Sequence, residues 1–320
     1  MLENMMFSLN STMPLFFIMV LGYLLFRSEF LSEEFIAVAN KFVYHVTLPV
    51  MLFNDLASTD ILNSFDLGFV VFCAASTVLS ILLIWLLCHC FLGDKSIIGE
   101  FVQACYRSSA AILGTAFIQN IYGSSGMSGL MILGSVPLYN IFAVLILTME
   151  SPIDQMHSVS LGSKLKTSFV KILKNPTLIA IFCGLLASLV QLPVPVILKK
   201  AMSSLGNMTS PLALLAIGAG FKGTEALAKI KPTITATVIK LLILPGIFLP
   251  IAVRFGFLDQ KLVALLVMLG SITTPSAYVM AKQLGHDGTL TGSVCAATTV
   301  FSAVTLTFWL FWAKSNSYII

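Results

Sequence analysis

Two stretches of the sequence place small, hydroxyl-bearing residues inside otherwise apolar segments. In the first, residues 107–109 (Arg-Ser-Ser) and Gly114 interrupt the apolar segment 101–121. The second lies within the uncharged segment 263–281, and its small and polar residues are Ser271, Thr273, Thr274, Pro275 and Ser276. Proline removes a backbone donor, and hydroxyl groups can satisfy the carbonyls that it frees, so we expect a helix to break in each stretch. The N–H and C=O groups exposed at such breaks can bind ions and substrates, whereas the alternative is a simple proline kink without a ligand.

Charged and polar side chains near these stretches are candidates for direct binding. Arg107 lies about two turns into its segment, and its guanidinium suits a carboxylate ligand bidentately. The alternative is an internal ion pair with Glu100, two turns earlier on a similar helix face. Four further residues are candidates for ion coupling or for support of the site: Asn54, Asp55, Lys240 and Asn120. Their alternatives are structural, namely helix capping for Asp55 and Asn120 and extension toward the cytoplasmic surface for Lys240.

The composition places these residues in a membrane. Of 320 residues, 58% are hydrophobic and only 10% are charged, whereas soluble proteins carry about 25% charged residues. Apolar runs of roughly 20 residues indicate an all-α integral membrane protein, because barrel strands are about half that length and alternate. The six cysteines form no CxxC pair, and no nucleotide-binding or hydrolase motif is present. We therefore expect no metal, no cofactor, no nucleic-acid partner and no enzyme activity.

The apolar segments predict ten transmembrane helices, in order of the chain. Their expected spans are 12–26, 38–56, 67–91, 101–121, 127–149, 168–190, 198–220, 232–253, 262–284 and 291–313. The longest polar connection, residues 150–166, separates the first five helices from the last five.

An internal repeat supports this division into residues 1–158 and 159–320. A shift of 162 residues superimposes five Gly and Pro positions without a gap: Pro14 on Pro176, Gly22 on Gly184, Pro49 on Pro211, Gly123 on Gly285, and Gly126 on Gly288. An odd number of helices per half means that the second half enters the membrane with opposite polarity, so we predict two inverted five-helix repeats.

The same shift superimposes the two interrupted stretches, since Ser109 falls on Ser271 and Gly114 on Ser276. Broken helices at corresponding positions of two repeats are typical of a transport site, so we expect the site to lie at these two breaks. Eleven loop lysines and arginines fall on the side of the central loop and five on the other. This asymmetry predicts a cytoplasmic central loop with both termini outside.

Several motifs resemble the auxin efflux carrier family, which includes the plant PIN proteins and many bacterial carriers. They are MPLFFIMVLGYLLF and VTLPVMLF in the first half, and KNPTLIAIFCGLLASLVQLPVP, SPLALLAIGAGF and AYVMAKQLGHDGTLTGSVCAATTVFSAVT in the second. The resemblance implies that helices 4 and 9 cross at their breaks. It also implies a scaffold of helices 1, 2, 6 and 7 and a moving transport domain of helices 3–5 and 8–10. It also implies organic anions as substrates.

The chain departs from the plant members of that family. Its central loop has only about 17 residues, and Ser109 and Ala116 stand where plant members carry asparagine and proline at the crossing. These differences favour a bacterial carrier of the inner membrane and argue against auxin as the substrate.

We therefore predict a secondary transporter of a small organic anion, a carboxylate, that works by alternating access around the crossing of helices 4 and 9. Proton or sodium coupling and a homodimer remain open. The alternatives are a sodium-coupled symporter of the bile-acid type and a membrane sensor that binds the ligand without moving it.

Overall fold

The computed structural model describes residues 2–57, 66–110, 118, 121–122, 126–151, 170, 173–221 and 223–319, with side chains from residue 13 onward. The described chain is helical. Its first half contains α1 (Leu2–Arg27), α2 (Glu33–Phe42), η1 (Val43–Thr47), α3 (Leu48–Ala57), α4 (Leu67–Phe91), η2 (Lys95–Ile97), α5 (Ile98–Tyr106) and α7 (Gly126–Met149). Its second half contains α10 (Pro176–Leu189), α11 (Val196–Asn207), α12 (Thr209–Ala219), α13 (Gly223–Ala228), α14 (Ile230–Val238), η4 (Ile239–Ile243), α15 (Leu244–Arg254), α16 (Asp259–Gly270), α17 (Pro275–Gln283) and α18 (Thr289–Ser315).

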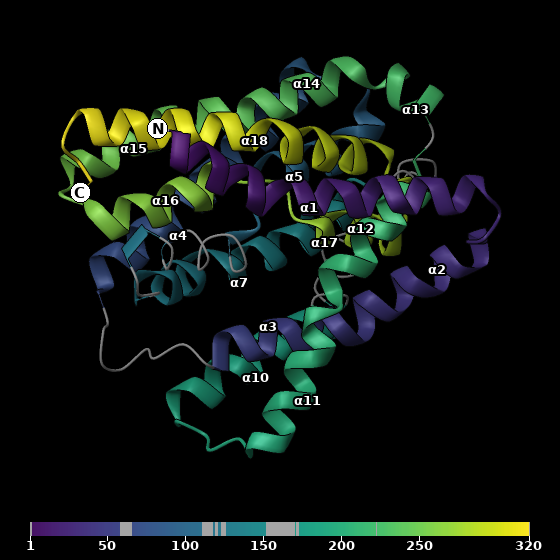
Figure 1. Ribbon diagram of the computed structural model, residues 1–320, viewed down its shortest axis with the longest axis horizontal. Coiled ribbons are helices and arrows are strands. Elements are labelled where there is room, and N and C mark those ends of the chain that lie inside the picture. The colour runs from purple at the N-terminus through teal and green to yellow at the C-terminus, as the bar shows by residue number, and fades with distance from the viewer. Residues whose placement is uncertain are drawn as a thin grey trace.

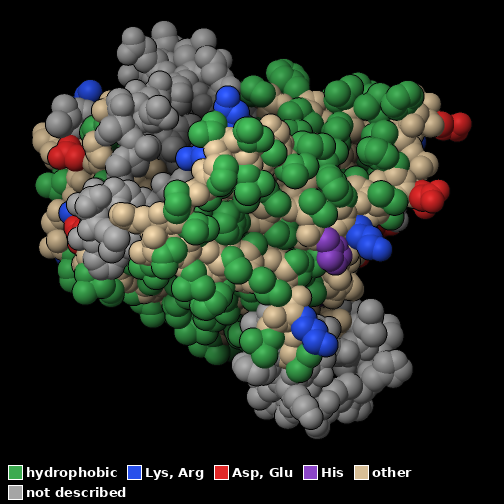
Figure 2. All heavy atoms as spheres, turned by 90° about the horizontal axis from the view of Figure 1, so that it is seen from below, with side chains coloured by type: hydrophobic (Ala, Val, Ile, Leu, Met, Phe, Trp, Pro, Cys, Tyr) green, Lys and Arg blue, Asp and Glu red, His purple; other side chains and the backbone are tan. Residues whose placement is uncertain are grey.

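Five of the described helical stretches are long and apolar enough to cross a membrane. They are Glu33–Ala57, Leu67–Phe91, Met127–Met149, Ile230–Arg254 and Thr289–Ser315. Their outward faces carry large apolar side chains, such as Leu86 on α4 and Phe301 on α18, which are 62% and 56% exposed. Figure 2 shows hydrophobic side chains over much of the coloured part of one face, with few charged groups among them. A face of this kind suits contact with lipid and not with water.

Local sequence signals explain where several helices begin. The Ser32 side chain accepts a hydrogen bond from the Phe35 N–H, and two acidic residues follow in the first turn of α2. The second predicted helix therefore starts near residue 33 and not at residue 38. In the same way, Asp66 caps α4 by accepting from the Phe69 N–H at 3.0 Å, and Asn175 precedes a proline at the first position of α10.

The helices form two groups (Figure 1). The first group contains α3, α10 and α11. Helix α12 contacts α11 of this group and packs along α1. The other contains α4, α5, α7 and the helices from α14 to α18, and α1 also lies along α18. This grouping follows the order of the chain in both halves, because the first helices of each half pack together and the last helices of each half pack together.

Glycines allow close backbone contacts between the two halves. A methyl group added at Gly22 on α1 would overlap the backbone of Leu215 on α12, and one added at Gly184 on α10 would overlap the backbone of Phe53 on α3. Small residues permit such approaches between helices in membranes. Gly184 and Leu215 lie 162 positions after Gly22 and Phe53, so the two contacts are reciprocal under the shift found in the sequence.

Candidate functional site

The first interrupted stretch begins where α5 ends. Tyr106 is the last helical residue, and Arg107 has an extended backbone with φ −77° and ψ 108°. The Arg107 N–H still bonds to the Gln103 carbonyl at 3.0 Å, which closes the last turn of the helix. The chain therefore leaves the helix at Arg107, and Ser108 and Ser109 follow in non-helical conformations.

The second stretch separates α16 from α17. Gly270 ends α16, and the backbone is extended at Ser271 (ψ 178°) and at Thr274 (ψ 137°). Pro275 occupies the first position of α17, where its missing N–H would have no intrahelical acceptor in any case. Proline disfavours a helical conformation for the preceding residue, so Pro275 both starts α17 and keeps Thr274 extended.

The two breaks lie against each other as a short antiparallel pair. Ser108 and Thr273 form a β-bridge. The Ser109 N–H donates to the Ile272 carbonyl at 3.0 Å, and the Thr274 N–H donates to the Arg107 carbonyl at 3.4 Å. Backbone groups that a continuous helix would satisfy internally are thus satisfied by the other broken helix.

Thr273 anchors this crossing to α5 and α18. Its hydroxyl donates to the Ala104 carbonyl at 2.8 Å. Its backbone N–H donates to the Thr298 hydroxyl at 3.0 Å, and its carbonyl accepts from the Cys295 thiol at 3.1 Å. Because every polar group of Thr273 has a partner, this residue stabilises the crossing and does not face a ligand.

Arg107 is buried at the crossing, with 3% of its surface exposed. Its guanidinium donates to the Asn140 side-chain oxygen at 2.8 Å, to the Ser276 hydroxyl at 3.3 Å and to the Met280 sulfur at 2.9 Å. All three acceptors are neutral. The alternative, an ion pair with Glu100, is not formed, because the helix ends before Arg107 and its side chain no longer shares a helical face with Glu100.

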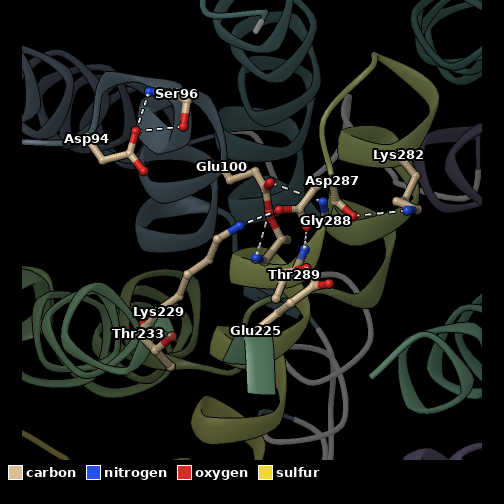
Figure 3. A network of polar contacts seen from close by, with 11 residues as sticks. Asp94, Ser96, Glu100, Glu225, Lys229, Thr233, Lys282, Asp287, Gly288 and Thr289 are labelled. Carbon is tan, nitrogen blue, oxygen red and sulfur yellow. Dashed lines mark hydrogen bonds and ion pairs between the residues drawn. The ribbon is translucent and has the colours of Figure 1, made fainter. Parts of the chain in front are cut away.

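Glu100 instead binds the start of α18, at the end of the helices farther from the crossing. Its carboxylate accepts from the N–H groups of Gly288 and Thr291, both at 3.0 Å, and from the Thr291 hydroxyl at 2.9 Å. A carboxylate is favourable there because the first N–H groups of a helix carry partial positive charge. Figure 3 shows Glu100 directed at this turn, beside Asp287 and its neighbours.

Asp287 completes the polar cluster shown in Figure 3, in the connection before α18. Its side chain pairs with Lys229 and accepts from the Thr289 N–H at 2.5 Å, and its carbonyl accepts from Lys282 at 3.0 Å. Burial alone would raise the pKa of this carboxyl, but the hydrogen bonds from Lys229 and Thr289 outweigh it and the pKa is lowered. The acidic groups of this cluster therefore have matched donors.

Lys240 also reaches the crossing. It lies in the π-helical turn η4, is completely buried, and donates to the Tyr106 carbonyl at 3.1 Å and to the Ser108 hydroxyl at 2.5 Å. The alternative reading, in which Lys240 extends toward the cytoplasmic surface, is wrong. The π-helical turn directs the side chain into the protein, where the end of α5 supplies its acceptors.

A cavity of about 30 Å³ adjoins the crossing. Arg107, Ser109, Asn140, Thr274 and Ser276 contribute polar groups to its lining. Its other wall is apolar and comes from α3: Leu48, Met51 and Leu52. This volume holds about one or two water molecules. The cavity therefore lies between the crossing and the other group of helices.

The predicted site residues separate into three sets. Arg107, Ser108, Ser109, Thr274 and Ser276 line the cavity together. A second set belongs to the crossing but does not line the cavity, namely Ser271, Thr273 and Pro275. The last two turns of α3 hold Asn54 and Asp55, which do not line the cavity either. Gly114 and Asn120 lie outside the described residues.

The sequence reasoning missed Asn140, Tyr139 and the α3 wall. Asn140 and Tyr139 stand in the middle of the apolar segment 127–149, where a polar side chain is costly, so that position was an available signal. The α3 residues are ordinary apolar side chains and carry no such signal.

Within the described residues, no group of three His, Cys, Asp or Glu side chains could hold a metal ion.

Comparison with known proteins agrees with this architecture. The family model described as "Membrane transport protein" matches residues 7–310 of the chain. No curated protein matches the chain. Together with the apolar helices, this match identifies a multi-pass membrane transporter. The chain therefore belongs to the membrane transport protein family of auxin efflux carriers and PIN-like proteins.

Proposed function

We propose that the protein is a secondary transporter of a small organic anion and that the carboxylate of this anion binds Arg107. The observation that carries the proposal is the buried guanidinium beside the cavity, whose acceptors within the described chain are all neutral. A buried cation without a counter-charge is costly, and an anionic ligand offsets that cost. Arginine also presents parallel donors that fit a carboxylate.

The distribution of ion pairs supports this reading. Within the described residues, the ion pairs are His89–Glu150, Lys229–Asp287 and Lys261–Asp66. All three involve connections or helix ends and none includes a side chain of the cavity. The start of α17 adds N–H groups of partial positive charge beside Thr274 and Ser276, which line the cavity.

The lining also favours one kind of anion. It contains one guanidinium, several neutral polar groups and an apolar wall from α3. A single carboxylate attached to an apolar body fits this combination better than two carboxylates, because a second charge would face Leu48 or Met51. We therefore place monocarboxylates ahead of dicarboxylates as candidate substrates.

The size and position of the cavity support alternating access as the mechanism. About 30 Å³ is too little room for an organic anion, so α3 and the crossing must separate for one to bind. The two walls come from different groups of helices, and relative movement of those groups would open the cavity. Such a movement would match the expected division into a scaffold of helices 1, 2, 6 and 7 and a transport domain of helices 3–5 and 8–10.

Reciprocal contacts support the inverted repeat that this mechanism uses. The Gly22–Leu215 and Gly184–Phe53 contacts are related by the 162-residue shift, as a two-fold axis between residues 1–158 and 159–320 would require. The antiparallel pairing of the two breaks also suits such an axis. We retain the ten-helix arrangement, with both termini outside a bacterial inner membrane, as part of the proposal.

A thermal-shift screen tests the binding part directly. Purified protein is heated with acetate, benzoate, malonate or succinate, because a ligand that binds only the folded state raises the melting temperature. We expect benzoate to raise the melting temperature of the wild type and to have a much smaller effect on Arg107→Gln at the same concentration. A response that is equal in both proteins would place the anion elsewhere. Binding without uptake into proteoliposomes would identify a sensor instead of a carrier.

A further inference from the structure

Lys240 provides a positive charge at the broken end of α5. Its side chain comes from another helix, is fully buried and ends 3.1 Å from the Tyr106 carbonyl and 2.5 Å from the Ser108 hydroxyl. Its described acceptors are therefore two neutral oxygens, one at the last residue of the half-helix and one in the break. No described carboxylate lies within ion-pair distance of the ammonium.

The end of α5 needs such a group. The last carbonyls of a helix have no intrahelical donors and carry partial negative charge, which is costly inside a membrane. The Gln103 carbonyl accepts from the Arg107 N–H, and the Ala104 carbonyl accepts from the Thr273 hydroxyl. The Tyr106 carbonyl accepts from Lys240, so the cation supplies the donor for the last carbonyl of this half-helix.

Carbonyl and hydroxyl oxygens at the C-terminal end of a broken helix are also the ligands that sodium uses in secondary transporters. Here the ammonium occupies the space beside both oxygens. We propose that Lys240 takes the place of a monovalent coupling cation at the crossing, so that transport proceeds without sodium or potassium. This inference rests on the proposed transport function and distinguishes it from a sodium-coupled symporter.

The π-helical turn that presents Lys240 is itself held in place. The Trp309 indole N–H on α18 donates to the Leu241 carbonyl at 3.0 Å. Such turns release backbone groups from the regular helical pattern and are frequent at functional sites. The lysine is thus positioned by its own turn on one side and by the end of α5 on the other.

Thermal unfolding of Lys240→Ala tests the proposal without relying on transport. The protein is compared in choline, sodium, potassium and n-propylammonium chloride at equal ionic strength. The alanine variant leaves a space that matches n-propylammonium, which restores the missing methylenes and the charge. We expect its melting temperature in choline to be about 3 °C or more below that of the wild type and to recover in n-propylammonium.

Two further variants isolate the charge. Lys240→Met retains apolar volume and removes the cation, so its melting temperature should fall and should not recover in n-propylammonium. Lys314→Ala removes an exposed lysine and should respond to none of the salts. A Lys240→Met protein as stable as the wild type would overturn the proposal, and so would a specific rise of the wild-type melting temperature in sodium chloride.

Uptake of radiolabelled benzoate by wild-type proteoliposomes supplies the second arm, which applies even if both Lys240 variants fail to fold. The initial rate should be the same when choline replaces sodium and potassium on both sides. A fall of about tenfold or more in choline would overturn the proposal, because it would reveal coupling to an alkali cation. If no condition gives benzoate uptake, the proposed function fails for this substrate, and the melting temperatures alone decide the role of Lys240.

Discussion

Charged side chains have different kinds of partner at the crossing and in the cluster at the start of α18. In the cluster, the Glu100 carboxylate receives three hydrogen bonds, and Asp287 is paired with Lys229. At the crossing, Arg107 and Lys240 are buried beside neutral acceptors only, within the described chain. Both regions use α5, so this one helix carries a matched charge near its start and an unmatched charge just after its end.

This difference separates structural charge from charge available to a ligand. A carboxylate whose acceptor sites are filled by a helix N-terminus stabilises the fold and has little capacity left for another partner. A guanidinium bonded only to neutral groups beside a cavity retains its full charge. Substitutions of the charged residue at the crossing should therefore mainly reduce binding. Substitutions in the cluster at the start of α18 should mainly reduce stability.

The largest expected effect is on anion binding, from Arg107→Gln. Loss of a charge-assisted hydrogen bond costs about 1.5–3 kcal/mol, so the affinity for benzoate should fall by roughly 10- to 150-fold. Arg107→Lys should recover part of the affinity, since it restores the charge without the bidentate geometry. Titration of ligand-dependent melting temperatures measures both. Unchanged affinity in Arg107→Gln would show that the unmatched charge serves the structure.

Ser109→Leu should block the cavity without changing its charge. Ser109 is buried and lines a space of about 30 Å³, which a leucine side chain would fill. We expect benzoate uptake to fall by about tenfold or more, while Ser109→Ala keeps most of it. Equal uptake by the leucine and alanine variants would place the substrate path away from the crossing.

Glu100→Gln should reverse the pattern seen for Arg107. The amide keeps an oxygen acceptor but loses the charge that favours the start of α18, so we expect unfolding to become easier by about 1–3 kcal/mol. The affinity for benzoate should stay within about twofold of the wild type, since Glu100 does not line the cavity. A large loss of affinity with unchanged stability would contradict the comparison of the two regions.

The smallest expected effect is pH-dependent and concerns Asp66, which caps α4 outside its membrane-spanning segment. The hydrogen bond from Lys261, at 2.6 Å, holds the pKa of the Asp66 carboxyl below its usual value. A lowered pKa in the folded state contributes stability above the unfolded value of about 3.9, and the contribution is lost as the pH falls through the folded value. Asp66→Asn keeps a good helix cap. Its melting temperature should therefore lie below that of the wild type at neutral pH and approach it in acid, and a constant difference would contradict this linkage.

The positions of the breaks could be predicted from the sequence because their causes are local. Pro275 and the surrounding hydroxyl residues mark the second break, and Arg107-Ser108-Ser109 mark the first. The partners of Arg107 could not be predicted in this way. The pairing with Glu100 assumed a continuous helix, whereas the chain becomes extended at Arg107 and turns toward Asn140 and Met280.

The role of Lys240 depended on information that the sequence does not contain. A lysine near the middle of an apolar segment predicts either a buried function or extension to the surface, and the choice depends on the π-helical turn η4. The apolar wall from α3 depended on long-range packing in the same way. Local chemistry could therefore identify the crossing, while the cavity beside it required the tertiary arrangement.

Uptake of radiolabelled benzoate into proteoliposomes that contain wild-type, Arg107→Gln or Glu100→Gln protein tests the central claim most directly. We predict saturable uptake by the wild type and by folded Glu100→Gln, and about tenfold or more lower uptake by folded Arg107→Gln at subsaturating benzoate. Equal uptake by Arg107→Gln and the wild type would contradict the assignment of Arg107 as the group that binds the transported carboxylate.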